Sequence, residues 1–259
     1  MPEAISPCAV NRATAGARPV ALPPAPPRGP GRRRRVVRVS AELFPRPAEE
    51  VAPGAVLLPG RLAEAAQREL LAACRGWAMP PAGLRTVRMP RGGEMSVRQL
   101  SLGRHWYPYG YAPTVVDGGG EPVKPFPGWL GEWARAAVDA AAEAAGEPRY
   151  GPGPCTVRYD VALVNFYGAG ARMGMHRDSD EPSDAPVVSF SLGDTCVFRF
   201  GNTEGRGRPW RDVPLRSGDA FVFGGPARRA YHGVPRTEPG SAPPGLGLRG
   251  RVNVTVRAY

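Results

Sequence analysis

The sequence lacks long apolar runs and is poor in cysteine. No segment holds about 18 consecutive apolar residues, the length that a membrane-spanning helix needs, so we expect no membrane partner. The four cysteines lie far apart and form no C-x-x-C pair, which argues against a disulfide framework or a zinc knuckle. The first residues also lack the apolar core of a secretory signal peptide. Together these absences favour a cytoplasmic location, where thiols stay reduced.

Acidic residues are scarce relative to basic ones. The chain of 259 residues has 23 Asp and Glu against 34 Lys and Arg, which gives a net charge of +11. Residues 1–40 hold eight arginines and a single acid, so most of the excess lies there. A basic arm of this kind favours a polyanionic partner, although a solvated tail without a role fits the same composition.

The composition divides the chain into a tail and one folded domain. Residues 1–48 are rich in Pro, Ala and Arg, with PPAPPRGPGRRRR at the centre. Such a segment buries too little apolar surface to offset the entropy lost on ordering, so we predict a disordered basic tail. Residues 49–259 have the composition of a globular domain, and we predict that they form a single domain.

The predicted domain has helices ahead of a β-rich half, which indicates an α+β fold. Apolar spacing predicts a helix over residues 63–74 and an alanine-rich helix over residues 129–145. Short β-type runs then follow at roughly ten-residue spacing, with Gly, Pro and Asp turns between them. This pattern is typical of an antiparallel sandwich, jelly roll or barrel. The predicted strands are VALVNFY, VVSFSLG, CVFRF, RDVPLRS, AFVFGG, ARRAYHG and RVNVTVRAY.

Two of the three histidines belong to a candidate metal site. His176 and Asp178 are two residues apart, and on a strand this spacing places both side chains on one face. His232 can supply a third ligand. Two imidazoles and one carboxylate on one face of the ion form the facial triad of non-haem Fe(II) oxygenases, which leaves positions for a cosubstrate and oxygen. By itself, H-x-D is a weak signal, and a surface turn or a hydrogen-bonded histidine in the core explains it better.

The run RVNVTVRAY predicts a strand with one valine face and one polar face. Its polar face carries Arg251, Asn253, Thr255 and Arg257. If this face lies inside a jelly roll, its buried guanidinium groups need anionic partners, and a dicarboxylic keto acid offers one carboxylate to each arginine. An exposed edge strand with solvated arginines is the alternative.

The strand that precedes the candidate metal site carries a second pair of polar residues. Asn165 and Tyr167 are two residues apart in VALVNFY, so they share one face and can bind the same cosubstrate. As an alternative, both residues cap a turn at the GAG sequence that follows.

These pieces together resemble the AlkB-type Fe(II)/2-oxoglutarate-dependent dioxygenases, which demethylate alkylated nucleobases. The resemblance runs from about residue 53 to residue 259, and it implies a double-stranded β-helix (jelly-roll) core with N-terminal helices and a nucleotide-recognition lid. The segments that carry it are GGEMSV (92–97), LVNFYGAGARMGMHRDSDEP (163–182), APVVSFSLGDTCVFRFG (185–201), SGDAFVFGG (217–225), AYHGV (230–234) and R-x-N-x-T-x-R (251–257).

The resemblance implies roles for the matched metal and cosubstrate residues. Fe(II) would be held by His176, Asp178 and His232. Arg251 would bind the distal carboxylate of 2-oxoglutarate, and Arg257 would lie near the carboxylate that chelates iron. The implied 2-oxoglutarate-binding residues are Asn165, Tyr167, Arg251, Asn253 and Arg257.

The substrate residues follow from the same resemblance. Trp106 would stack on the flipped base opposite His176, and Asp180 would contact the exocyclic amino group of the base. A loop arginine would also contact the substrate, and Arg206 is assigned over Arg208 because the 201–210 loop is one residue longer than expected. The tyrosines of the lid that recognise the nucleotide would be Tyr109 and Tyr111.

Two features depart from the family pattern. Phe223 occupies a position at which Trp also occurs, and the basic N-terminal arm is absent from the bacterial archetype.

The implied reaction is oxidative demethylation of 1-methyladenine or 3-methylcytosine in DNA or RNA. It consumes O2 and 2-oxoglutarate and releases succinate, CO2 and formaldehyde. We expect a monomer that accepts single strands, since an unpaired lesion is easier to extract from its stack. The alternatives are a related oxygenase acting on tRNA or protein, and a nucleic-acid-binding protein without turnover.

Overall fold

The structure is a computed structural model that describes residues 44–146 and 157–259. The predicted tail, residues 1–48, therefore lies outside the described residues except for its last five. The described residues belong to one compact unit, and the first strand in it begins at Glu49.

The eight strands of the larger sheet are all antiparallel to their neighbours. Side chains along these strands point alternately to the two faces of the sheet, and both faces are buried, so the sheet separates two apolar cores. Across the sheet, the strands are β1 (Glu49–Ala52), β2 (Ala55–Leu58), β12 (Ala220–Phe223), β9 (Val187–Gly193), β14 (Arg251–Arg257), β7 (Val161–Tyr167), β4 (Glu94–Leu102) and β3 (Arg85–Arg88).

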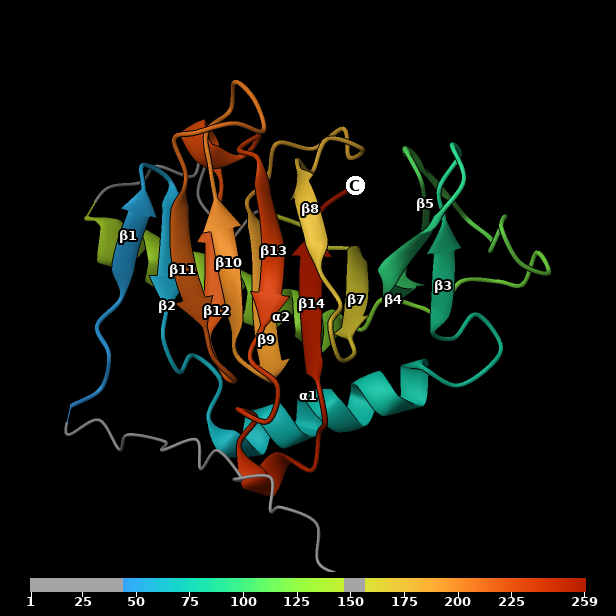
Figure 1. The fold of residues 1–259 in the computed structure, drawn as a ribbon, viewed down its shortest axis with the longest axis horizontal. Coiled ribbons are helices and arrows are strands. Elements are labelled where there is room, and N and C mark those ends of the chain that lie inside the picture. Colours follow the sequence, from blue (N-terminus) through green and yellow to red (C-terminus); the bar gives the residue numbers. More distant parts are fainter. Residues whose placement is uncertain (1–43, 147–156) are drawn as a thin grey trace, which may run out of the picture. The chain divides into compact units, whose positions relative to one another are not determined.

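A smaller antiparallel sheet lies in front of the larger one in Figure 1, and the second apolar core fills the space between them. Phe198 and Phe200 of the smaller sheet pack against Phe221 and Phe223 of the larger sheet. Two facing antiparallel sheets confirm the predicted jelly roll. The smaller sheet has the order β11 (Arg211–Leu215), β10 (Cys196–Phe200), β13 (His232–Thr237) and β8 (Met173–His176).

One helix covers the far side of the larger sheet, and a second lies at the ends of its strands (Figure 1). α1 (Glu64–Trp77) and α2 (Gly128–Ala145) confirm both predicted helices, and α2 ends at Gly146, whose left-handed φ of 69° suits a C-cap. Leu130, Ala134 and Val138 line the face of α2 that packs on the sheet. Figure 1 shows α2 behind the sheet and α1 below the ends of its strands. Among the described residues, no helix is long and apolar enough to cross a membrane.

Three short elements complete the described fold. The hairpin β5 (His105–Tyr107) and β6 (Gly110–Ala112) forms its own two-stranded sheet. Two single 3₁₀ turns are η2 (Gly225–Ala227) and η3 (Pro244–Leu246).

Strand β14 lies inside the larger sheet, between β9 and β7. Its valines, Val252, Val254 and Val256, belong to the core shared with the helices. Because side chains alternate along a strand, its polar row faces the space between the two sheets. All seven residues are buried, so the alternative of an exposed edge strand is wrong.

The prediction of a strand over ARRAYHG is wrong for most of this segment. Backbone turns occupy residues 224–231, and strand structure begins only at His232. The Gly-Gly-Pro sequence directly before it favours a tight turn, here η2, over an extended chain.

Candidate metal and cosubstrate site

Two side chains of the smaller sheet and one from the segment that follows β8 converge on one point. His176 ends β8 and His232 begins β13, and the two residues face each other in the antiparallel ladder. Asp178 Oδ1 lies 3.8 Å from His176 Nε2 and 3.9 Å from His232 Nε2. One ligand atom from each of the three residues lies within 4.8 Å of the others, close enough to bind a single ion.

The expectation that one strand carries both His176 and Asp178 is wrong. β8 ends at His176, and Asp178 belongs to the irregular segment that follows. The two side chains still meet, because the irregular segment leaves Asp178 Oδ1 within 3.8 Å of His176 Nε2.

Both imidazoles are held in the tautomer that a metal needs. His176 Nδ1 lies 2.9 Å from the Gly174 carbonyl, and His232 Nδ1 lies 3.0 Å from the Ala230 carbonyl. A carbonyl only accepts, so each Nδ1 carries the proton and each Nε2 keeps a free lone pair. Burial lowers the pKa of His232 to about 4, assisted by the neighbouring His176. His232 is therefore neutral at physiological pH, as a metal ligand must be.

Asp178 divides its two oxygens between the imidazoles and an arginine. Oδ1 faces the two Nε2 atoms, whereas Oδ2 accepts from Arg257 Nη2 at 2.7 Å and from Nε at 3.1 Å. Burial raises the pKa of this carboxyl group, but the charge of Arg257 and the two imidazoles outweigh burial and hold the pKa well below its usual range. Asp178 thus stays ionised, with one oxygen directed at the ion position.

Arg251 is the most deeply buried cation of the site, at 1% exposure. Its Nη2 donates to Ser191 Oγ at 3.0 Å, and Asn253 Oδ1 lies 3.3 Å away. Its Nε and Nη1 have no partner among the described residues. A buried guanidinium with two free donors fits a carboxylate ligand, which is what the distal end of 2-oxoglutarate offers.

The predicted metal and cosubstrate residues come together in one cavity between the two sheets. Phe198 of β10, Phe223 of β12 and Val234 of β13 add apolar walls to it. The residues of the two predicted sets that line it are Asn165, Tyr167, His176, Asp178, His232, Arg251, Asn253 and Arg257.

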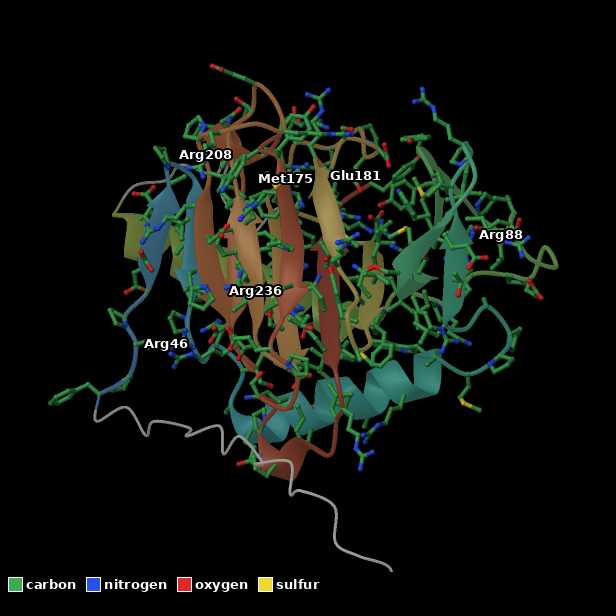
Figure 2. All side chains as sticks on the ribbon, in the orientation of Figure 1. Arg46, Arg88, Met175, Glu181, Arg208 and Arg236 are labelled. Atoms are coloured by element: carbon green, nitrogen blue, oxygen red, sulfur yellow. The ribbon has the colours of Figure 1, made fainter. Side chains whose placement is uncertain are left out.

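A larger cleft of about 740 Å³ opens beside this cavity and shares His176, Asp178 and Arg257 with it. Four of the predicted substrate residues line the cleft: Trp106, Tyr109, Asp180 and Arg206. Figure 2 labels Met175, which also lines it, at the upper end of β8, between the labelled Arg208 and Arg88.

The hairpin β5–β6 carries the aromatic side of the cleft. Trp106 Nε1 donates to Asp180 Oδ2 at 2.8 Å, so the predicted stacking residue and the predicted base-edge acceptor contact each other directly. Tyr109 is 76% exposed at the tip of the hairpin. Its backbone has a left-handed φ of 73°, which is unusual for a residue other than Gly or Asn.

The two loop arginines lie in different places. Arg206 lines the cleft, whereas the Arg208 guanidinium lies 4.9 Å from the ring centroid of Trp210. Of the two, only Arg206 is among the residues that line the cleft.

Tyr111 lies apart from the other predicted substrate residues. Its hydroxyl donates to Glu181 Oε1 at 2.5 Å and accepts from Arg257 Nη1 at 3.1 Å. Burial raises its pKa above the usual range, and Glu181 and Asp178 add to this rise against the opposing charge of Arg257. The hydroxyl thus stays protonated inside the protein and does not line the cleft.

Sequence reasoning missed several residues of the site. Ser189 and Ser191 share the polar face of β9, a placement that the alternation in VVSFSLG could have indicated. Gln99 of β4 holds the amide of Asn165, with Nε2 3.0 Å from Asn165 Oδ1. Glu181 and Arg228 had no sequence signal, because the pairing of two charged loop residues is not periodic.

The chain is similar to known proteins over most of its length. Residues 54–257 match the family model described as "2OG-Fe(II) oxygenase superfamily". The "Alpha-ketoglutarate-dependent dioxygenase AlkB homolog" of Caulobacter vibrioides is 38% identical over 229 residues, which covers 87% of this chain and 96% of that protein. The "DNA N(6)-methyladenine demethylase ALKBH1D" of Arabidopsis thaliana is 31% identical over 229 residues, covering 81% of this chain and 50% of that protein.

The chain also has the same fold as a solved structure. The chain titled "The structure of OsALKBH1" has a TM-score of 0.73 and 32% sequence identity, and the match covers 82% of this chain and 100% of that one. The family match spans all strands of the jelly roll except β1, and within it two imidazoles and one carboxylate offer the donor set that Fe(II) takes in these enzymes. The chain therefore belongs to the AlkB-type Fe(II)/2-oxoglutarate-dependent dioxygenases, and its cofactors are Fe(II), 2-oxoglutarate and O2.

Proposed function

We propose that the protein demethylates bases alkylated on a ring nitrogen, of the 1-methyladenine and 3-methylcytosine type, in DNA or RNA. The observation that carries this proposal is the cleft, which joins the candidate metal ligands to an indole, a carboxylate and an arginine. A nucleotide needs these three groups: a stacking surface for its base, an acceptor for the exocyclic amino group of the base, and a cation for its phosphate.

We assign the binding of 2-oxoglutarate to the polar face of β14 and its neighbours on β7. When bound, Fe(II) and 2-oxoglutarate supply an oxidation that converts 2-oxoglutarate and O2 to succinate and CO2 and releases the methyl group as formaldehyde. Arg251 binds the distal carboxylate, since its Nε and Nη1 need an acceptor. Arg257 meets the other carboxylate beside Asp178, and Asn165, Tyr167 and Asn253 complete the pocket.

The base is held by the two residues that already contact each other. Trp106 stacks on one face of the base, which is worth about 1–3 kcal/mol. Asp180 uses Oδ2 for the indole N–H, so Oδ1 can accept from the exocyclic amino group of adenine or cytosine. Arg172, Arg177 and Arg206 at the cleft can neutralise phosphates on either side of the lesion.

The proposal is tested with protein, Fe(II), 2-oxoglutarate, ascorbate and a single-stranded oligonucleotide that carries one 1-methyladenine or one 3-methylcytosine. We expect the oligonucleotide to lose the mass of one methylene, formaldehyde to appear in equal amount, and a chelator to stop both. Oligonucleotides with N6-methyladenine run in parallel, because the Arabidopsis relative is named for that substrate.

The outcomes separate the candidate functions. Succinate formation with every oligonucleotide untouched would contradict the proposed substrates and favour tRNA or a protein. Bound iron without succinate formation would favour a binding protein that has lost turnover.

Substitution of Trp106 separates stacking from hydrogen bonding. Trp106→Ala removes the stacking surface and is expected to raise the KM for the oligonucleotide by about 5- to 150-fold. Trp106→Phe keeps a ring but loses the bond to Asp180, so we expect a smaller increase. Steady-state kinetics with varied oligonucleotide measures both effects. Equal KM values in the wild type and in both variants would place the base elsewhere.

The two loop arginines form a matched pair of variants. Arg206→Ala is expected to weaken oligonucleotide binding and to reduce its salt slope by about one, because one phosphate contact is lost. Arg208→Ala, whose guanidinium lies over Trp210, is expected to leave the slope unchanged. Binding titrations at several salt concentrations measure the slope, and the reverse result would assign the contact to Arg208.

A further inference from the structure

Three side chains joined by two hydrogen bonds and an ion pair form a ring that connects the hairpin β5–β6 to the metal-ligand segment. Tyr111 Oη donates to Glu181 Oε1 at 2.5 Å and accepts from Arg257 Nη1 at 3.1 Å. Arg257 Nε closes the ring at 3.3 Å from the same Glu181 oxygen. The three residues come from β6, from the segment after β8 and from β14, so three separate parts of the fold meet in this ring.

Glu181 is a fixed acceptor in this ring. It is 3% exposed, and its other oxygen lies 3.3 Å from Arg228 Nη2. Arg228 is equally buried and also donates to the backbone carbonyls of Asp178, Ser183 and Ala185 at 2.7, 3.2 and 2.9 Å. Figure 2 places Glu181 near the upper end of β8, beside the labelled Met175 of the cleft. Buried contacts with Arg228 thus hold the segment that supplies Asp178 in place.

Arg257 also contacts the candidate metal ligand Asp178. Arg257 Nη2 and Nε both contact Asp178 Oδ2, whereas Nη1 contacts Tyr111. Each Nη group carries two hydrogens; Nη1 uses one of its two on Tyr111, and Nη2 uses one of its two on Asp178. The contact with Asp178 fixes the direction of the second Nη2 hydrogen, and the contact with Tyr111 fixes that of the second Nη1 hydrogen.

We propose that Tyr111 is a positioning residue that, with Glu181, orients Arg257 so that its remaining hydrogens meet the metal-chelating carboxylate of 2-oxoglutarate. Tyr111 lies opposite Trp106 in the hairpin, and Trp106 is bonded to Asp180, the neighbour of Glu181. The hairpin that receives the base therefore also sets the affinity for the cosubstrate. This inference rests on the assignment of Arg257 to 2-oxoglutarate and does not depend on which base is demethylated.

The test replaces Tyr111 by phenylalanine, which removes one hydroxyl group and keeps the ring. We expect the KM for 2-oxoglutarate to rise by about 5- to 20-fold, while kcat for succinate formation at saturating 2-oxoglutarate changes by less than about twofold. The Kd measured without oxygen, from the visible charge-transfer absorption of the Fe(II)–2-oxoglutarate complex, is expected to rise by the same factor. Tyr107→Phe, in β5 of the same hairpin and outside the ring, is the matched control and is expected to keep both constants.

A second variant tests whether the two residues act as one unit. Glu181→Gln is expected to raise the same KM, and the double variant Tyr111→Phe/Glu181→Gln should be no worse than the poorer single variant. Unchanged KM and Kd in Tyr111→Phe would overturn the inference, as would a fall in kcat and thermal stability at constant KM, which indicates a purely structural bond. Either result would leave the proposed function standing if Arg251 variants still lose 2-oxoglutarate affinity.

Discussion

Arg251→Met is expected to raise the KM for 2-oxoglutarate by about 30-fold or more. Removal of one partner from a buried, hydrogen-bonded charge pair costs about 2–5 kcal/mol, and about 1.4 kcal/mol corresponds to a factor of ten. Methionine is similar in length to the arginine stem, so the variant removes the guanidinium donors with little loss of packing volume. The KM comes from succinate formation at varied 2-oxoglutarate.

The same variant is expected to keep its thermal stability when 2-oxoglutarate is absent. Arg251 is buried with Nε and Nη1 unpartnered among the described residues, and an unpaired buried cation destabilises the fold. The wild type should therefore gain stability when 2-oxoglutarate is added, and Arg251→Met should gain little. Arg236→Met is the matched control, because Arg236 is exposed on β13 and is labelled on the smaller sheet in Figure 2.

The interpretation of Arg251 has a clear point of failure. An unchanged KM together with a lower melting temperature would show that the guanidinium is a structural group and that the distal carboxylate binds elsewhere.

Asp178→Asn is expected to reduce Fe(II) affinity more than 100-fold and to bring succinate formation to background. Loss of a residue that merely supports a metal ligand costs about 10- to 100-fold in affinity, and Asp178 is in the position of a ligand. The amide keeps the volume of the side chain but lacks the charge that opposes Arg257 and the metal ion. Anaerobic Fe(II) titration and succinate formation measure the two effects.

Asp212→Asn is the matched control for Asp178→Asn. Asp212 pairs with Arg199 on the surface, with distances of 2.7 and 2.8 Å, and an exposed pair of this kind contributes only about 0–1 kcal/mol. This variant should bind iron and turn over normally. If Asp178→Asn did the same, the assignment of the metal site would be wrong.

The sequence predicted those parts of the site that depend on local periodicity or on the quoted family segments. Alternation in residues 251–257 was enough to place Arg251 and Asn253 on one face, since a strand has only two faces. Residue type identifies the third ligand, His232, but the strand predicted before it is a turn in the structure. The Gly-Gly-Pro sequence at 224–226 determined that turn and outweighed the apolar pattern.

Contacts between distant segments are beyond local patterns. H-x-D indicates one strand, but convergence of His176 and Asp178 depends on where β8 stops, and pairing with β13 determines that point. The assignment of Tyr111 to nucleotide recognition rests on the family resemblance and stays a prediction. Its hydroxyl lies next to Glu181 and Arg257, which are 70 and 146 residues away in the sequence. No local pattern encodes such partners.

The central place of β14 has a consequence for how the protein folds. β14 follows every other labelled strand in the sequence, yet its partners are β9 and β7, which were formed by residues 187–193 and 161–167. Until β14 inserts, both neighbours expose an unpaired, largely apolar strand edge, which is a template for intermolecular pairing. Contacts of such long sequence separation form slowly, so insertion of β14 is expected to be a late step. Aggregation during refolding should therefore compete with the same event that completes the arginine pocket.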